Sequence, residues 1–126
     1  MRPEVVLRDY SDALIQFTEA LSIPAKHDVI RAGCIQFFEF AFELAWKSVK
    51  AVAEDSGLDP GGSPKSCIKT AFSQGWIDHE KIWLEMLDAR NRMSHTYDAK
   101  EVLVIYERLP AILTPLAGLL DNLEMQ

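Results

Sequence analysis

A short segment around residue 90 carries the side chains with the clearest chemical potential. Arg90, Asn91, His95 and Tyr97 lie within about two helical turns of one another. An arginine guanidinium is a planar, permanently charged fork that matches phosphate oxygens. A histidine, with an ordinary pKa near ~6.5, can transfer a proton at neutral pH. Together these residue types predict phosphate binding or phosphodiester chemistry.

The same segment also has a purely structural interpretation, because basic residues and histidine are favoured near the C-terminal end of a helix. Helical spacing places Asn91 and His95 on one side, if the helix extends that far. Arg90 projects about 100° away, in line with Trp83 and Leu87 at the edge of the packed face. Packing there would hold the guanidinium in place. The spacing alone leaves both interpretations open.

A second candidate for acid–base chemistry is the carboxylate pair Glu39 and Glu43, one helical turn apart. Glu43 also precedes Lys47 by four residues, the favoured orientation of a helical ion pair, so the sequence favours a salt-bridged surface here. The chain has three histidines and no Glu-x-x-His motif, and we therefore expect no metal site. The glycine-rich stretch after Gly57 lacks phosphate-loop spacing. No cofactor is expected.

Length and composition are those of one folded domain over residues 1–126. Nearly half of the residues are apolar and a quarter are charged, and the net charge is −6. This acidity argues against indiscriminate nucleic-acid binding. The charged N-terminus does not resemble a secretory signal, and no membrane partner is expected. Cys34 and Cys67 are far apart and are expected to be buried, unpaired thiols. The sequence therefore predicts a soluble, cytoplasmic protein.

Apolar residues recur every three or four positions along most of the chain, which predicts helices. The expected ranges are residues 4–21, 27–56, 79–94 and 99–122, with a shorter helix from Pro64 to about Gln74. The second helix has two adjacent apolar stripes and should therefore be central. Short connections favour antiparallel neighbours. The prediction is an all-α fold: an up-and-down four-helix bundle with one additional short helix.

Turn and cap residues support these boundaries. Ser63 is expected to cap the short helix, and Asp78 the helix after it. Asp98 has the position of a cap for the last helix, with Glu101 at capping-box spacing. Two prolines inside the last helix, at positions 110 and 115, should bend it because each removes an amide donor.

The segment "RNRMSHTYD" resembles the Arg-x4-His-x-Tyr signature of HEPN-domain proteins. Two further segments, "IQFFEFAFELAWKSVKAVAEDSGLD" and "SPKSCIKTAFSQGWI" followed by "WLEMLDARN", resemble the nucleotidyltransferase substrate-binding branch of that family. The resemblance extends from about residue 4 to 122 and implies a four-helix-bundle homodimer, encoded together with a small, separate nucleotidyltransferase.

The resemblance also implies roles for individual residues. In many HEPN proteins the motif belongs to a metal-independent endoribonuclease, so Arg90 and His95 would be catalytic and Asn91 would support them. Tyr97 would complete the extended motif, and in related pairs the nucleotidyltransferase is thought to silence the HEPN toxin by adenylylating this tyrosine. Because each chain supplies one motif histidine, a two-fold dimer would bring two into one cleft.

Two functions therefore follow as hypotheses. The first is an endoribonuclease toxin controlled by its nucleotidyltransferase partner in a toxin–antitoxin-type module. The alternative is a non-catalytic subunit that binds a nucleotide or substrate for the nucleotidyltransferase. A third option, a purely structural helical dimerisation module, treats the motif as a capped turn. The sequence does not decide whether the protein is an enzyme, which RNA or nucleotide it binds, or which helices form the dimer.

Overall fold

The computed structural model describes residues 2–93 and 98–126, and in these residues all regular structure is helical. Five helices follow one another, close to the predicted ranges: α1 (Pro3–Leu21), α2 (Asp28–Asp55), α3 (Pro64–Ser73), α4 (Glu80–Met93) and α5 (Ala99–Glu124). The prediction of an all-α fold is confirmed.

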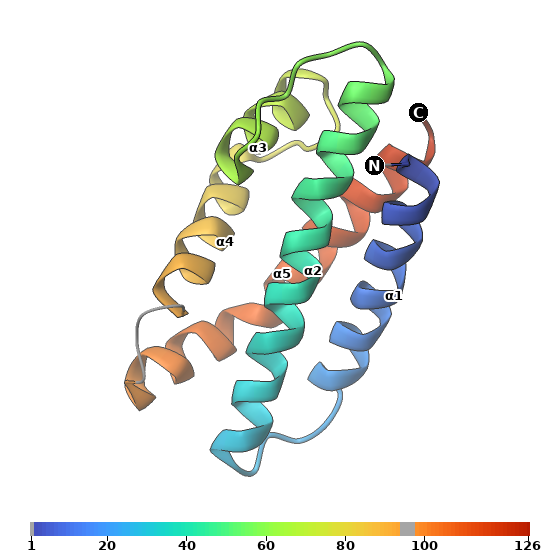
Figure 1. The fold of residues 1–126 in the computed structure, drawn as a ribbon. Helices are drawn as coiled ribbons and strands as arrows, with labels where there is room; N and C mark the ends of the chain where they lie inside the picture. The colour runs from blue at the N-terminus through green and yellow to red at the C-terminus, as the bar shows by residue number, and fades with distance from the viewer. Residues whose placement is uncertain (1, 94–97) are drawn as a thin grey trace.

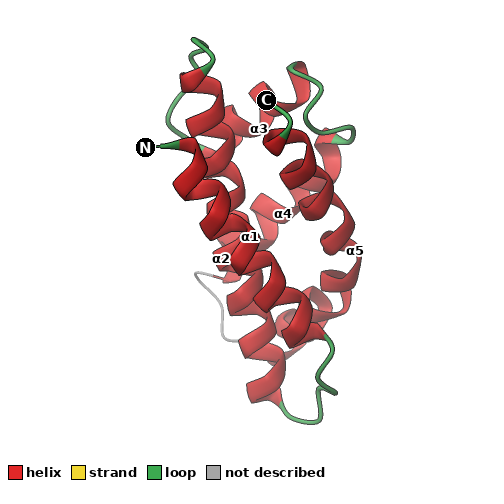
Figure 2. Cartoon of the chain, turned by 90° about the vertical axis from the view of Figure 1, so that its right-hand side faces the viewer, coloured by secondary structure: helices red, strands yellow, loops and turns green. Residues whose placement is uncertain are grey.

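The four long helices alternate in direction along the bundle, and the short α3 lies between α2 and α4 in the chain (Figure 1). Both views show α1 and α2 running side by side, and both chain termini lie at the same end of the bundle (Figures 1 and 2). α2 packs against α1, α3 and α5, whereas α4 packs mainly against α3 and α5 and meets α2 through a few side chains. The up-and-down arrangement with one additional short helix is therefore observed.

The core is built around α2, as its two apolar stripes predict. Its buried side chains come from both stripes: Cys34 and Ala41 from one, and Phe38, Phe42, Ala45 and Val49 from the other. Cys34 and Cys67 are free thiols in the interior, and burial raises the pKa of each. A helix contacted from several sides is thus the scaffold on which the remaining helices are placed.

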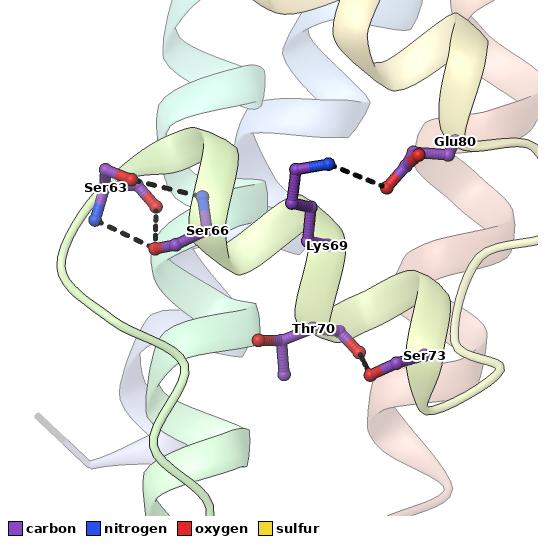
Figure 3. A network of polar contacts seen from close by, with 6 residues as sticks. All are labelled: Ser63, Ser66, Lys69, Thr70, Ser73 and Glu80. Atoms are coloured by element: carbon purple, nitrogen blue, oxygen red, sulfur yellow. Dashed lines mark hydrogen bonds and ion pairs between the residues drawn. The ribbon is translucent and has the colours of Figure 1, made fainter.

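The turn before α3 is held by a reciprocal cap (Figure 3). The Ser66 amide donates to Ser63 Oγ at 3.1 Å, and the Ser63 amide donates to Ser66 Oγ at 3.2 Å. Gly61 has a φ of +74°, and a Cβ at this position would lie 2.6 Å from Ser66 Oγ. The chain therefore requires glycine there. The predicted Ser63 cap is confirmed.

At the N-terminal ends of α4 and α5, the structure differs in part from the caps that the sequence predicts. α4 begins at Glu80, so His79 rather than Asp78 precedes its first residue. Asp98 does cap α5, because its Oδ1 accepts a hydrogen bond from the Lys100 amide at 2.9 Å. The Glu101 side chain, expected to complete a capping box, accepts a hydrogen bond from Arg92 at 3.2 Å.

α5 continues through both of its prolines, and its two halves run in different directions (Figure 1). Tyr10 of α1 reaches the C-terminal half, where its buried hydroxyl donates to the Leu116 carbonyl. By length and composition alone, α5 is apolar enough to cross a membrane, with a mean hydropathy of 1.5 over its most apolar window. Only 28% of that window is buried within the chain, so an apolar surface of α5 faces outward.

Candidate functional site

Arg90 lies in the last turn of α4, on the side that faces α2. Trp83, two turns earlier on the same side, is buried, and Leu87 is partly buried against the core. The Arg90 side chain is 31% exposed. The predicted position at the edge of the packed face is therefore confirmed.

Arg90 is joined to α2 by an ion pair with Glu43. Arg90 Nη2 lies 2.5 Å from Glu43 Oε1, and the Glu43 side chain is 28% exposed. Glu43 Oε1 is shielded from solvent and accepts no hydrogen bond from the described residues. Its negative charge is compensated by the ion pair with Arg90. A contact of this kind is screened less by salt than one on an open surface.

The second oxygen of Glu43 is held from within α2. Trp46, one turn further along, donates a hydrogen bond from Nε1 to Glu43 Oε2 at 3.0 Å. Lys47 Nζ lies 5.9 Å from the centre of the Trp46 ring. The sequence favoured Lys47 as the partner of Glu43, and this was wrong because a cation from another helix occupies that position.

Glu39 lies one turn before Glu43 and is half-buried. Burial raises its pKa; the nearby Arg90 charge lowers it, and the Glu43 charge raises it again. The fold thus brings the two carboxylates of α2 to the end of α4. The sequence identified these carboxylates and Arg90 separately, but not that they meet.

Asn91 lies next to Arg90 and bonds to it. Arg90 Nη1 donates to Asn91 Oδ1 at 3.0 Å, and the Asn91 side chain is exposed. The structure therefore brings together two of the predicted site residues. The other two, His95 and Tyr97, lie outside the described residues, so the shared face of Asn91 and His95 stays a prediction.

The neighbouring Arg92 shows how different an ordinary surface arginine is. Its Nε lies 3.0 Å from Asp88, one turn back on α4, and its Nη1 lies 3.2 Å from Glu101 at the start of α5. The side chains of Arg92 and Asp88 are both largely exposed, and such pairs contribute little to stability. Of these two arginines of α4, Arg90 is the more buried, and it is the one that pairs with α2.

Chemically, this arrangement is an oriented guanidinium at the rim of a helical bundle. Arginine is suited to phosphate and carboxylate oxygens because its donors form a planar fork. Two carboxylates and an exposed amide surround it. Such a group can bind an anionic substrate and stabilise negative charge that develops during a reaction.

Comparisons with known proteins agree with this architecture. Residues 6–125 match the family described as nucleotidyltransferase substrate binding protein like. The chain is 31% identical over 103 residues to a probable ribonuclease HepT from Haemophilus influenzae, covering 79% of this chain and 70% of that protein.

Two solved structures have the same fold. One, from Thermus thermophilus, is 32% identical, with 90% of this chain and 98% of that chain covered and a TM-score of 0.83. The other, from Haemophilus influenzae, is described as revealing the fold of a substrate binding domain of a nucleotidyltransferase. It is 27% identical, with 97% and 96% covered and a TM-score of 0.70. By this match over nearly its whole length, the chain belongs to the nucleotidyltransferase substrate-binding protein family of HEPN-domain proteins.

Proposed function

We propose that this protein is the HEPN subunit of a two-component nucleotidyltransferase module and that it cleaves RNA without a metal ion. The observation that carries the proposal is Arg90, held at the end of α4 by Glu43 and still partly open to solvent. The relative named as a probable ribonuclease supports the same activity. Its partner is a small, separate nucleotidyltransferase, in keeping with the family description.

The proposed reaction uses the RNA's own 2′-hydroxyl as the nucleophile, already tethered close to the phosphorus. The O2′–P bond forms as the P–O5′ bond breaks, which leaves a cyclic phosphate and a free 5′-hydroxyl. One His95 of the two-fold dimer accepts the 2′-hydroxyl proton, and the His95 of the second copy donates a proton to the leaving O5′. Each such transfer typically contributes about 10²–10⁴-fold. Arg90 stabilises the negative charge on the phosphoryl oxygens. Asn91 orients the guanidinium through its hydrogen bond.

The nucleotidyltransferase partner controls the activity by modifying Tyr97. An AMP group on that tyrosine adds bulk and a negatively charged phosphate seven residues after Arg90 in the sequence. This phosphate would compete with RNA for Arg90. The structure does not describe Tyr97, so this step depends on the family signature.

The experiment for this proposal is incubation of the purified protein with single-stranded RNA in EDTA. We expect cleavage products that end in a cyclic phosphate, and we expect His95→Ala to lose the activity while keeping the helical far-ultraviolet spectrum. Intact RNA with the wild-type protein, under conditions where the protein is folded, would contradict the nuclease function.

The alternative is a non-catalytic subunit that presents a nucleotide to the nucleotidyltransferase. The observation that favours it is the charge around Arg90, because Glu43 neutralises the guanidinium and Glu39 lies nearby in a chain of net charge −6. In this case RNA would stay intact, and the protein would instead raise the activity of the co-purified nucleotidyltransferase. The EDTA assay therefore separates the two functions.

We also propose that the protein is a homodimer in which α4 and α5 face the second copy. A groove of about 390 Å³ lies between these helices, with an apolar floor that includes Ile82, Met86, Ala89 and Ile105. Leu103 and Val104 are exposed on the same helix, α5. Light scattering at micromolar concentration should give a mass close to twice the 14.2 kDa of one chain. A mass near 14.2 kDa would contradict the dimer.

A further inference from the structure

We propose that Glu43 is a positioning residue for Arg90: it holds the guanidinium in the orientation in which it meets the phosphate. This inference rests on the proposed function and adds a residue from α2, outside the signature segment of α4. Its basis is the ion pair of 2.5 Å between the two helices.

Glu43 is well suited to hold another side chain because it is itself held. Its Oε2 accepts the hydrogen bond from Trp46 Nε1 at 3.0 Å, and its Oε1 faces Arg90 in a position shielded from solvent. Trp46 is partly buried against the core and lies on the same helix. The carboxylate is therefore fixed at both oxygens by groups from α2 and α4.

Positioning matters for this arginine because its long side chain would otherwise sample many rotamers. A guanidinium that is ordered before the substrate binds does not lose that freedom during the reaction, and its fork already has a defined plane. Small displacements of a catalytic group of about 1 Å can lower a rate by about 10²-fold. Glu43 connects this orientation to α2, through the ion pair and its own hydrogen bond from Trp46.

Two other roles for the same ion pair make different predictions. If Glu43 only ties α4 to α2, its loss lowers stability but leaves the reaction of the folded protein unchanged. If the carboxylate competes with phosphate for Arg90, its loss strengthens binding and raises kcat/KM. A positioning role predicts a lower kcat with little change in KM, because the interaction is lost mainly in the transition state.

The first test compares Glu43→Gln, which keeps the shape and removes the charge, with Asp88→Asn, which does the same to the exposed partner of Arg92. In RNA cleavage well below the melting temperature, we expect Glu43→Gln to lower kcat by about 10–100-fold with KM within about threefold. Asp88→Asn should leave both unchanged. An unchanged or raised kcat/KM in Glu43→Gln would overturn the proposal.

The second test is chemical rescue with guanidinium ion. In Arg90→Ala, the Glu43 carboxylate remains and should bind free guanidinium chloride at millimolar concentration, far below a denaturing amount. We expect at least a tenfold rise in cleavage over the same concentration of sodium chloride. The double variant Glu43→Gln/Arg90→Ala should show no such rise. Equal rescue in both variants would mean that Glu43 does not hold the guanidinium.

These outcomes can be told apart from failure of the proposed function. If wild-type protein leaves RNA intact, the nuclease function and this inference fall together, whether or not it binds a non-cleavable 2′-O-methyl oligonucleotide. If wild-type protein cleaves RNA and Glu43→Gln cleaves it equally well, the nuclease function stands and the positioning role of Glu43 falls.

Discussion

Replacing Arg90 by alanine is expected to lower the rate of RNA cleavage by about 10²–10³-fold, the usual effect of removing one donor that stabilises transition-state charge. The physical reason is that Arg90 is a permanently charged side chain held at the rim of the bundle. Single-turnover rates in EDTA, measured at saturating RNA, check this prediction. Glu43 loses its ion-pair partner in this variant, so its stability could change. Thermal unfolding of the same variant therefore serves as the control that it is folded during the assay.

Two further variants sharpen this result. Arg92→Ala removes an arginine two positions away, which pairs with the exposed Asp88 and the partly buried Glu101 and is itself 59% exposed. It should change the rate less than about threefold, because ion pairs of such an exposed side chain contribute little. Arg90→Lys keeps the charge without the planar fork and should recover only part of the activity. Equal losses in Arg90→Ala and Arg92→Ala would indicate general electrostatics rather than a specific phosphate contact.

Replacing Phe42 by alanine is expected to lower the free energy of unfolding by about 3–5 kcal/mol, the range for a large aromatic side chain removed from a core. Phe42 is completely buried. Its ring centre lies 6.1 Å from that of Phe38 and 6.4 Å from that of Trp83, so it joins α2 to α4. Urea unfolding followed by circular dichroism measures the loss.

Phe40 is the matched control, because it lies on the same helix and is 48% exposed. Phe40→Ala should change the free energy of unfolding by less than about 1 kcal/mol, since much of its surface meets solvent already. If Phe40→Ala destabilised the isolated chain as much as Phe42→Ala, the core would not be centred on the buried face of α2. The Phe42–Trp83 contact joins α2 to α4, the helix that carries Arg90, so its loss would also affect the position of Arg90.

The helices of this protein were predictable because helical hydrogen bonds and apolar periodicity are local. The spacing of Phe38, Phe42, Ala45 and Val49 is present in the sequence, and these side chains are buried in α2. The Ser63 and Asp98 caps were predictable for the same reason, since each bonds within its own turn. The edge position of Arg90 follows from its register with Trp83.

The partner of Glu43 could not be predicted in this way. Within α2, Lys47 has ideal spacing, and no local rule identifies a competitor from another helix. The rings of Trp83 and Phe42 meet between α4 and α2, with centres 6.4 Å apart, and further along the same two helices Arg90 meets Glu43.

The sequence alone therefore determined the helices, their order and the residues able to do chemistry. The tertiary structure decided which charges meet, because that depends on side chains packed between segments far apart in the chain. Local spacing favoured a salt-bridged surface for Glu39 and Glu43 of α2. In the folded chain both carboxylates lie near Arg90 of α4.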